Sequence, residues 1–395
     1  NFREGAIGGG GEQAALTKEI KVVDDYTLDF VTKVPEPIYP AFFFRVLLAN
    51  PKQIKEDPDS VATNPIGTGP YKLVDWQKGQ FIKLTANEGY WGPQPNIKDV
   101  TVVARAEPMV RASMLKAGEA DLIWRLSPEE AQGMPKVKPF STAETVIVRL
   151  NPTNPVLKDE RVRQALSYAI DRKALVDALY KGFAIPATQD IPSFVLGYNP
   201  DIKAWPYDTE KAKQLLKDAG YNGEELAFYH RASRIPREQE MGEALGGMWK
   251  DVGINVSLKV VESAGFMEAL RGFQQNPEPY QKGEGMADMT EWPTGAELLD
   301  SYQVIYANYH SNGPNSLVRW DAADPELDKK IEAAGQLVDV KAREKAFQAI
   351  FAEVAPKMFY IKLFHVQTIH AMSANVEWEP RADDIINFAE MKLKD

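Results

Sequence analysis

Residues 64–92 read NPIGTGPYKLVDWQKGQFIKLTANEGYWG, and this stretch decides how the first part of the chain folds. Its first seven residues hold two glycines and two prolines, which predict a tight turn because glycine tolerates positive φ and proline fixes φ. The runs 71–76 and 81–85 are rich in aromatic and branched residues, which favour strands. A Gln-Lys-Gly turn at 77–79 joins the two runs, so the stretch predicts a β-hairpin.

The order of these residues also points to a family. Gly-Thr-Gly-Pro-Tyr, a tryptophan before a Lys-Gly turn and Tyr-Trp-Gly at 90–92 resemble the signature of extracytoplasmic solute-binding proteins of ABC importers, in the peptide/nickel class (family 5, oligopeptide- and dipeptide-binding proteins). The segment DERVRQALSYAIDR at 159–172 resembles the same family. The glycines and prolines of the signature shape a hairpin, so they identify the family without contacting a ligand.

The resemblance implies a fold and a domain organisation. We expect two α/β lobes of the periplasmic-binding-protein fold (type II-like, cluster C), joined by two crossings that act as a hinge, with a ligand cleft between them. Lobe one is expected at 1–150, lobe two at 151–364, and residues 365–395 return to lobe one. Family members usually carry a further segment ahead of the strand matching 22–30, so we expect lobe one to be N-terminally incomplete.

The residue pattern favours the same class independently, because strand and helix signals alternate along the chain. A strand pair is expected at 21–34 and a short buried helix at 41–48. Ser127 begins a helix as an N-cap, followed by proline at the first helical position and glutamate at the third. Met and Trp residues between 241 and 252 form the apolar stripe of an amphipathic helix, which predicts core packing. Periodicity is lost at 273–315, and long irregular segments are often functional.

Composition excludes several classes of protein. At 395 residues the chain has room for two or three cores, and no apolar run approaches the roughly 20 residues of a membrane-spanning helix. The net charge is −10 with Lys and Arg scattered, which argues against nucleic acid or an anionic membrane as a partner. The absence of cysteine excludes disulfides, thiolate catalysis and most structural zinc sites, and leaves the redox compartment undetermined.

No catalytic motif is present. The four histidines have no metal-ligand spacing, and the chain lacks a Gly-x-Ser-x-Gly elbow, a dinucleotide fingerprint and a Walker motif; the glycines at 8–11 are not followed by Gly-Lys-Ser/Thr. We therefore expect no enzyme, no cofactor and no metal.

The resemblance implies capture of a small solute, for which we expect a short peptide, and its delivery to a membrane ABC permease by a periplasmic monomer. An oligosaccharide, an opine-like or other plant- or microbe-derived solute, and a nickel chelate remain alternatives within the fold. The aromatic residues that favour a sugar are Trp124, Trp292, Trp320 and Tyr302. A non-transport interaction protein is a second class, and an enzyme has no motif in its support.

The resemblance also implies a ligand anchor. Gly-Met-Ala-Asp-Met-Thr-Glu-Trp-Pro at 285–293 is similar to the lobe-two motif whose aspartate holds a peptide's amino terminus, which makes Asp288 the counterpart. The aromatic residue expected after the aspartate is Met289, and Glu291-Trp292 precedes the proline. These departures leave two alternatives open, namely that Trp292 stacks on a sugar and that Asp288 accepts hydroxyl groups. The simplest alternative is that Asp288 is a turn or helix-cap residue in a solvated loop and has no role toward a ligand.

Trp124 is a candidate in lobe one, because it follows a short strand at 121–123 and precedes the helix begun at Ser127. Strand-to-helix loops often carry binding groups in α/β folds. Trp124 as ordinary core is an equal alternative. The candidate ligand-binding set is completed by Met286, Tyr229 and Arg231.

Overall fold

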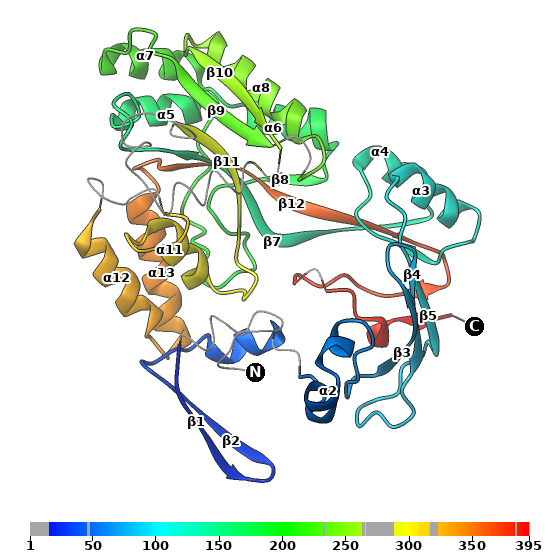
Figure 1. Cartoon of the computed structure of the whole chain (residues 1–395). Coiled ribbons are helices and arrows are strands. Elements are labelled where there is room, and N and C mark those ends of the chain that lie inside the picture. Colours follow the sequence, from blue (N-terminus) through cyan, green and yellow to red (C-terminus); the bar gives the residue numbers. More distant parts are fainter. Residues whose placement is uncertain are drawn as a thin grey trace. The chain divides into compact units, whose positions relative to one another are not determined.

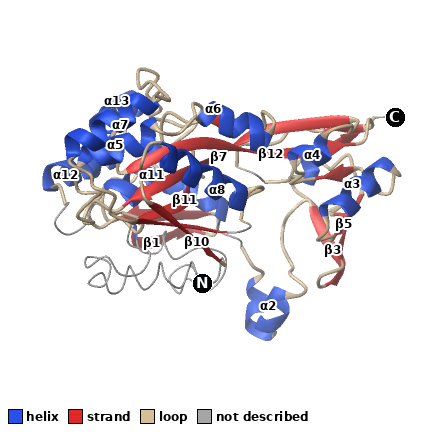
Figure 2. Cartoon of the chain, turned by 90° about the horizontal axis from the view of Figure 1, so that it is seen from above, coloured by secondary structure: helices blue, strands red, loops and turns tan. Residues whose placement is uncertain are grey.

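The computed structural model describes residues 16–45, 48–231, 234–262, 265, 288–316, 323–383 and 385–394. These divide into two compact units. Unit 1 takes residues 1–30, 39–140 and 368–395, and unit 2 takes 31–38 and 141–367. The divisions after Phe140 and Gln367 fall inside two long strands, β7 (Lys136–Leu150) and β12 (Tyr360–Met372), which are neighbours in one sheet and run side by side in Figure 2. The sequence places its two crossings near Leu150, the last residue of β7, and near Phe364, within β12.

The hairpin predicted from 64–92 is confirmed in unit 1. Strands β3 (Tyr71–Gln77) and β4 (Phe81–Ala86) pair antiparallel, and β5 (Asp99–Val103) pairs with β4 to complete a three-stranded sheet (Figure 1). Gly79 has φ +76 in the connecting turn, a conformation that favours glycine. Asn87 closes the other end by donating from Nδ2 to the carbonyl of Gly69 at 3.0 Å.

The rest of unit 1 consists of short elements. The expected strand pair is confirmed as a hairpin. The run expected as a short buried helix, 41–48, begins within a 3-10 helix in which Phe42 is buried, and its residues 46–47 lie outside the described residues. The capping box at Ser127 and Glu130 is confirmed, although its helix ends after one turn. The elements are β1 (Thr17–Asp24), β2 (Thr27–Thr32), η1 (Tyr39–Arg45), α2 (Pro51–Glu56), η2 (Pro58–Ala62), α3 (Pro108–Lys116), β6 (Leu122–Ile123), α4 (Pro128–Ala131), β13 (Val376–Glu377), η5 (Phe388–Glu390) and β14 (Lys392–Leu393).

Unit 2 is built on a mixed sheet. The strands lie in the order β10-β9-β11-β7-β12, β8 pairs with β12, and β6 pairs with the unit 1 end of β12. Amphipathic helices flank the sheet. Asp159 and Asp208 are the N-caps of two of them, and their side chains accept backbone N–H groups of the first turn. The elements are α5 (Glu160–Tyr168), α6 (Arg172–Leu175), η3 (Val176–Tyr180), β8 (Ala184–Pro186), α7 (Thr209–Ala219), β9 (Leu226–Arg231), α8 (Glu238–Asp251), β10 (Val256–Val261), β11 (Met289–Gly295), α11 (Ser301–Tyr309), α12 (Pro325–Gly335) and α13 (Val340–Val354).

Strand β11 corrects the expectation of an irregular segment at 273–315. It pairs antiparallel with β7 along its whole length and parallel with β9 at its start. Pro293 lies inside it, opposite Val146, and proline cannot donate to a ladder, so the sequence gives a weak strand signal. Helix α11 follows within the same segment. Residues 273–287 of the same segment lie outside the described residues, as do 1–15 with the glycine run.

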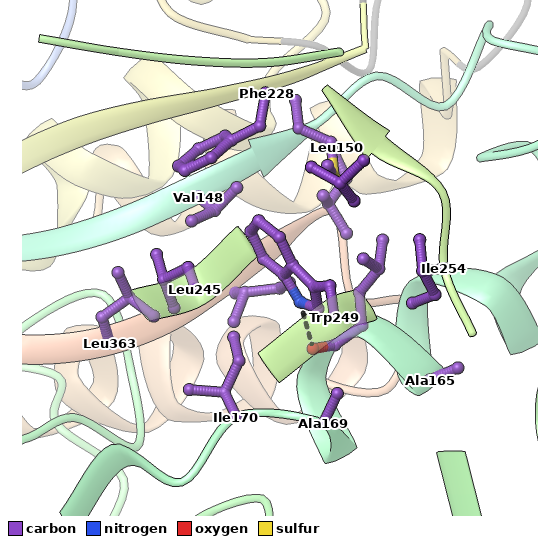
Figure 3. Packing of buried hydrophobic residues seen from close by; sticks show 14 of the residues in the cluster. Val148, Leu150, Ala165, Ala169, Ile170, Phe228, Leu245, Trp249, Ile254 and Leu363 are labelled. Atoms are coloured by element: carbon purple, nitrogen blue, oxygen red, sulfur yellow. Dashed lines mark hydrogen bonds between the residues drawn. The ribbon is translucent and has the colours of Figure 1, made fainter. Parts of the chain in front are cut away.

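Two apolar cores cover the two faces of this sheet. Helices α5, α7 and α8 pack on one face, and α11, α12 and α13 on the other (Figure 1). Trp249 of α8 is fully buried in the first core; its indole Nε1 donates to the Leu166 carbonyl at 2.9 Å and its ring meets Phe228 edge-on at 5.1 Å (Figure 3). The predicted Met and Trp stripe is thereby confirmed as core. Among the described helices, none is long and apolar enough to cross a membrane.

Candidate functional site

Asp288, the expected ligand anchor, stands immediately before β11 and is half-buried. Its Oδ1 accepts from Asn154 Nδ2 at 2.6 Å and its Oδ2 accepts from the backbone N–H of Ala227 at 2.7 Å. Burial raises the pKa of the carboxyl, and the hydrogen bonds from Ala227 and Asn154 oppose that rise. The side chain therefore ties the loop that contains Asn154 and the start of β9 to the start of β11. Its role toward a ligand stays a prediction.

Trp292 is the centre of the most distinctive polar arrangement in unit 2. The residue lies on β11 opposite Ile147, and its ring is half-buried. The guanidinium carbon of Arg149 lies 5.5 Å from the ring centre and that of Arg231 lies 5.7 Å from it, within the range of cation–π attraction. We call Trp292, Arg149 and Arg231 the tryptophan–arginine wall.

Arg149 was not among the residues expected from the sequence. It lies on β7, is almost fully buried, and donates from Nη2 to the carbonyl of Asn315 at 2.8 Å. The sequence does single out Arg149, because it is the one charged residue in the apolar strand sequence TVIVRL at 145–150. Buried arginines require acceptors and often serve recognition, which makes such an interruption informative.

Two buried carboxylates hold Arg231 in place. Its Nη2 lies 3.4 Å from Glu291 Oε2 and its Nε lies 3.4 Å from Glu238 Oε1, and both glutamates are fully buried. Burial raises the pKa of Glu291 to about 8; the Arg231 charge opposes this rise, and Glu238 reinforces it through its charge and a side-chain hydrogen bond. The raised pKa favours the protonated form of Glu291, since two ionised carboxylates beside the Arg231 guanidinium would leave a net charge in the core.

The other expected residues are distributed as follows. Tyr229 lies half-buried on β9, beside Thr290 of β11. Trp124 belongs to unit 1, where it is half-buried and lines a pocket of about 860 Å³. Met286 and Trp320 lie outside the described residues. The structure thus brings Trp292 and Arg231 together and assigns Trp124 to a different unit.

The four histidines belong to no metal-binding cluster in the part of the chain that is described. There, no group of three or more His, Asp or Glu side chains is placed to hold a metal ion. His365 lies in β12 with its Nδ1 2.8 Å from Thr145 Oγ1, and burial lowers its pKa to about 4. His370 is also buried, with its pKa lowered to about 4 by burial and by the charge of Arg125. Both imidazoles are therefore neutral at physiological pH.

Comparison with known proteins identifies relatives over most of the chain. The model for the middle region of bacterial extracellular solute-binding proteins, family 5, matches residues 5–316. The dipeptide-binding protein of Escherichia coli (strain K12) is 30% identical over 272 residues, covering 65% of this chain and 51% of that protein. Heme-binding protein A of Haemophilus influenzae is 27% identical over 330 residues, covering 81% of this chain and 58% of that protein. The chain spans about half the length of these curated relatives.

Solved structures agree with this assignment. HbpA2 from Haemophilus parasuis superposes with a TM-score of 0.82 at 25% identity, covering 96% of this chain and 76% of that one. DppA from Helicobacter pylori, solved in complex with the peptide STSA, superposes with a TM-score of 0.75 at 22% identity, covering 97% and 75%. These likenesses confirm the predicted periplasmic-binding-protein fold. The chain belongs to the family 5 bacterial extracellular solute-binding proteins.

Proposed function

We propose that this chain is a periplasmic solute-binding protein that captures a small carboxylate-bearing solute, foremost a short peptide, and delivers it to the permease of an ABC importer. One observation carries the choice of solute. In unit 2 two guanidinium groups, those of Arg149 and Arg231, flank the half-buried indole of Trp292.

The wall suits an anion with an apolar body. Guanidinium groups match carboxylates in charge and geometry, and an indole ring offers a rigid apolar face. Both arginines are buried beside this ring, in surroundings of low dielectric where charges attract more strongly than in water. A short peptide supplies both the carboxylate and the apolar side chains.

The named ligands of the relatives support this chemistry. Dipeptides, haem and glutathione appear in the names of matched binding proteins, and all three carry carboxylates. The family is one of extracellular proteins, which supports a periplasmic location, and delivery to an ABC permease is the role that the family resemblance implies.

A thermal-shift screen tests the proposal. Its probes are dipeptides, tripeptides, glutathione, haem and nickel–histidine, set against neutral oligosaccharides. A ligand present at 100 times its Kd stabilises the folded protein by about 2.7 kcal/mol, which gives a clear shift in Tm. We expect shifts with carboxylate-bearing probes and a smaller shift when a peptide's carboxyl terminus is amidated. A screen in which no probe of this kind raises Tm would contradict the proposal.

A neutral oligosaccharide is the second candidate, because the ring of Trp292 is partly exposed and could serve as a stacking platform. The same screen separates the two. Sugars alone raising Tm would favour this alternative, since a sugar has no charge for the two guanidinium groups to recognise.

A further inference from the structure

Arg231 links the two faces of the sheet in unit 2. Glu291 and Trp292 are consecutive residues of β11, so their side chains point to opposite faces. Arg231 is the last residue of β9, the strand beside β11 (Figure 1). Its Nη2 lies 3.4 Å from Glu291 Oε2, and its guanidinium carbon lies 5.7 Å from the centre of the Trp292 ring. Its charge therefore acts both on the tryptophan–arginine wall and on the buried carboxylates behind that wall.

Each of the two buried carboxylates has one oxygen that accepts no hydrogen bond. Glu291 Oε2 accepts from Arg231, and Glu238 Oε2, at the start of α8, accepts from the backbone N–H of Arg234. Among the described residues, no donor makes a hydrogen bond to the Oε1 atom of either glutamate, although both side chains are fully buried. A buried acceptor without a donor is costly, and two like charges side by side add to that cost.

One proton held between the two glutamates removes both costs. The protonated carboxyl then donates and the ionised carboxylate accepts, as in other carboxyl pairs that share a proton. Burial is the main cause of the raised pKa of Glu291, and Glu238 adds to it through its charge and a side-chain hydrogen bond. The two carboxyls are therefore within hydrogen-bonding reach, and the proton belongs to the pair rather than to either residue.

The other titratable groups around the pair keep their charge near neutral pH. Burial, and then the charges of the two glutamates, raise the pKa of the Tyr180 hydroxyl in η3, so this group stays protonated. Burial lowers the pKa of His230 in β9, so its ring is neutral. Arg234 is partly exposed and forms an ion pair with Glu144 of β7. The glutamate pair is therefore the group in this cluster whose charge changes as pH rises above neutrality.

The shared proton sets the charge of the whole cluster. The guanidinium groups of Arg149 and Arg231 are two cations, and a pair that holds one proton supplies one anion. One positive charge is then in excess beside the ring of Trp292. A solute with one ionised carboxylate balances this excess. Loss of the shared proton balances it from within the protein, and the solute then meets no net charge.

We propose that Glu238 and Glu291 hold one proton between them and thereby couple solute binding at the tryptophan–arginine wall to pH, with one proton kept for each carboxylate bound. The inference rests on the proposed capture of a carboxylate-bearing solute and makes a single carboxylate the preferred number at the wall. Because the anion favours the protonated pair, affinity is complete below the pKa of the pair and declines above it. The two glutamates are positioning residues, since they act through Arg231.

The first experiment needs no solute. Carbon-13 NMR of the whole chain, labelled at the glutamate carboxyl carbons, follows the ionisation of each carboxyl. We expect one titration between about pH 7 and pH 9, well above the ordinary range for glutamate. It should be absent in Glu291→Gln and move to lower pH in Glu238→Gln, which removes the like charge. A wild-type chain in which no glutamate titrates above about pH 6 overturns the shared proton, whichever solute binds.

The second experiment measures binding by calorimetric titration from pH 7 to pH 9. The probe is acetyl-alanyl-leucine, whose carboxyl is its only ionisable group. We expect the wild type to lose about tenfold more affinity over this range than Glu291→Gln, which cannot ionise. The matched control is Glu240→Gln, which removes an exposed glutamate of the same helix that is paired with Arg237, and it should follow the wild type.

Proton counting tests the coupling without any variant. Titrations of the wild type at pH 8.5, in buffers of different ionisation enthalpy, give the number of protons that bind with the probe. We expect uptake of about half a proton or more per peptide, since the free pair is then largely ionised. Binding without uptake, or an equal decline of affinity in wild type and Glu291→Gln, overturns the coupling and leaves solute capture standing. Failure of every carboxylate probe to bind at any pH defeats the proposed function, and this inference with it.

Discussion

At the scale of single residues, the tryptophan–arginine wall depends on the indole of Trp292. Trp292→Leu removes the ring that two guanidinium groups flank, and we expect the affinity for a carboxylate-bearing ligand to fall about tenfold, or ~1.4 kcal/mol. Calorimetric titration measures this change. The matched control is Trp205→Leu, which removes a half-buried indole packed on Tyr168 in the same unit and should leave affinity unchanged. Equal losses in the two variants would mean that the effect is general destabilisation.

Asp288 calls for separate measurements of stability and binding. Both carboxylate oxygens accept N–H groups, so Asp288→Asn turns an amide NH₂ toward a donor, and we expect unfolding in urea to become easier by ~1–3 kcal/mol. The anchoring role predicted from the sequence requires more. It needs at least a tenfold loss of affinity for a peptide with a free amino terminus and no loss for its acetylated form. Unchanged affinity would leave Asp288 with the structural role alone.

Glu291 should make the stability of unit 2 depend on pH. Burial raises its pKa to about 8 in the folded state, above the ordinary value of 4.5, so the folded chain keeps a proton that the unfolded chain loses. This contribution to stability is complete below about pH 4.5 and is lost as pH rises to about 8. Glu291→Gln, which cannot ionise, should remove that decline. Parallel declines of the free energy of unfolding in wild type and variant between pH 5 and 8 would contradict it.

At the scale of elements, signals from neighbouring residues in the sequence predicted most of the helices, strands and turns that this article names in advance. The cap at Ser127 and the turn with left-handed Gly79 lie where the sequence places them, because caps and turns are decided by neighbouring residues. Strand β11 was missed for the opposite reason. Its order comes from β7 and β9, which are remote in sequence, and Pro293 weakens its own local signal. Arg149 escaped notice as a site residue because the pairing of β7 with β11 brings it to Trp292, and Glu238 because the packing of α8 brings it to Arg231.

Helix α8 offers a sharp test of packing. A Cβ at Gly242 would lie 2.5 Å from the His230 ring, whereas one at Gly247 on the same helix would meet nothing within 4 Å. Gly242→Ala should therefore destabilise the chain by ~1–3 kcal/mol through overpacking. Gly247→Ala should stabilise it by ~0.5–1 kcal/mol, since alanine favours helices over glycine. Urea unfolding measures both, and effects of the same sign would show that α8 does not pack on His230 in this way.

At the scale of the whole molecule, the chain contains separate cores. Unit 2 has two large apolar clusters, one on each face of its sheet, and unit 1 has a smaller one around Met372 and Trp378. The sequence predicted two α/β bodies from the alternation of elements and the family resemblance. It places the two crossings near Leu150 and Phe364, which belong to β7 and β12, and a strand shared by two units carries no turn or breaker that would mark a boundary more closely.

Separate cores predict that a ligand held at the tryptophan–arginine wall stabilises one unit more than the other. At 100 times its Kd a ligand adds about 2.7 kcal/mol to the unit that binds it, which slows exchange of that unit's most protected amides about 100-fold. Hydrogen exchange should show this slowing in α8 and β9 of unit 2, while the β3–β4 hairpin of unit 1 changes much less. The two long strands argue against independent unfolding of the units. Both β7 and β12 run through the two units, so the shared sheet could make both units unfold together. Equal slowing in the hairpin would show that the chain unfolds as one cooperative body and that its cores are not independent.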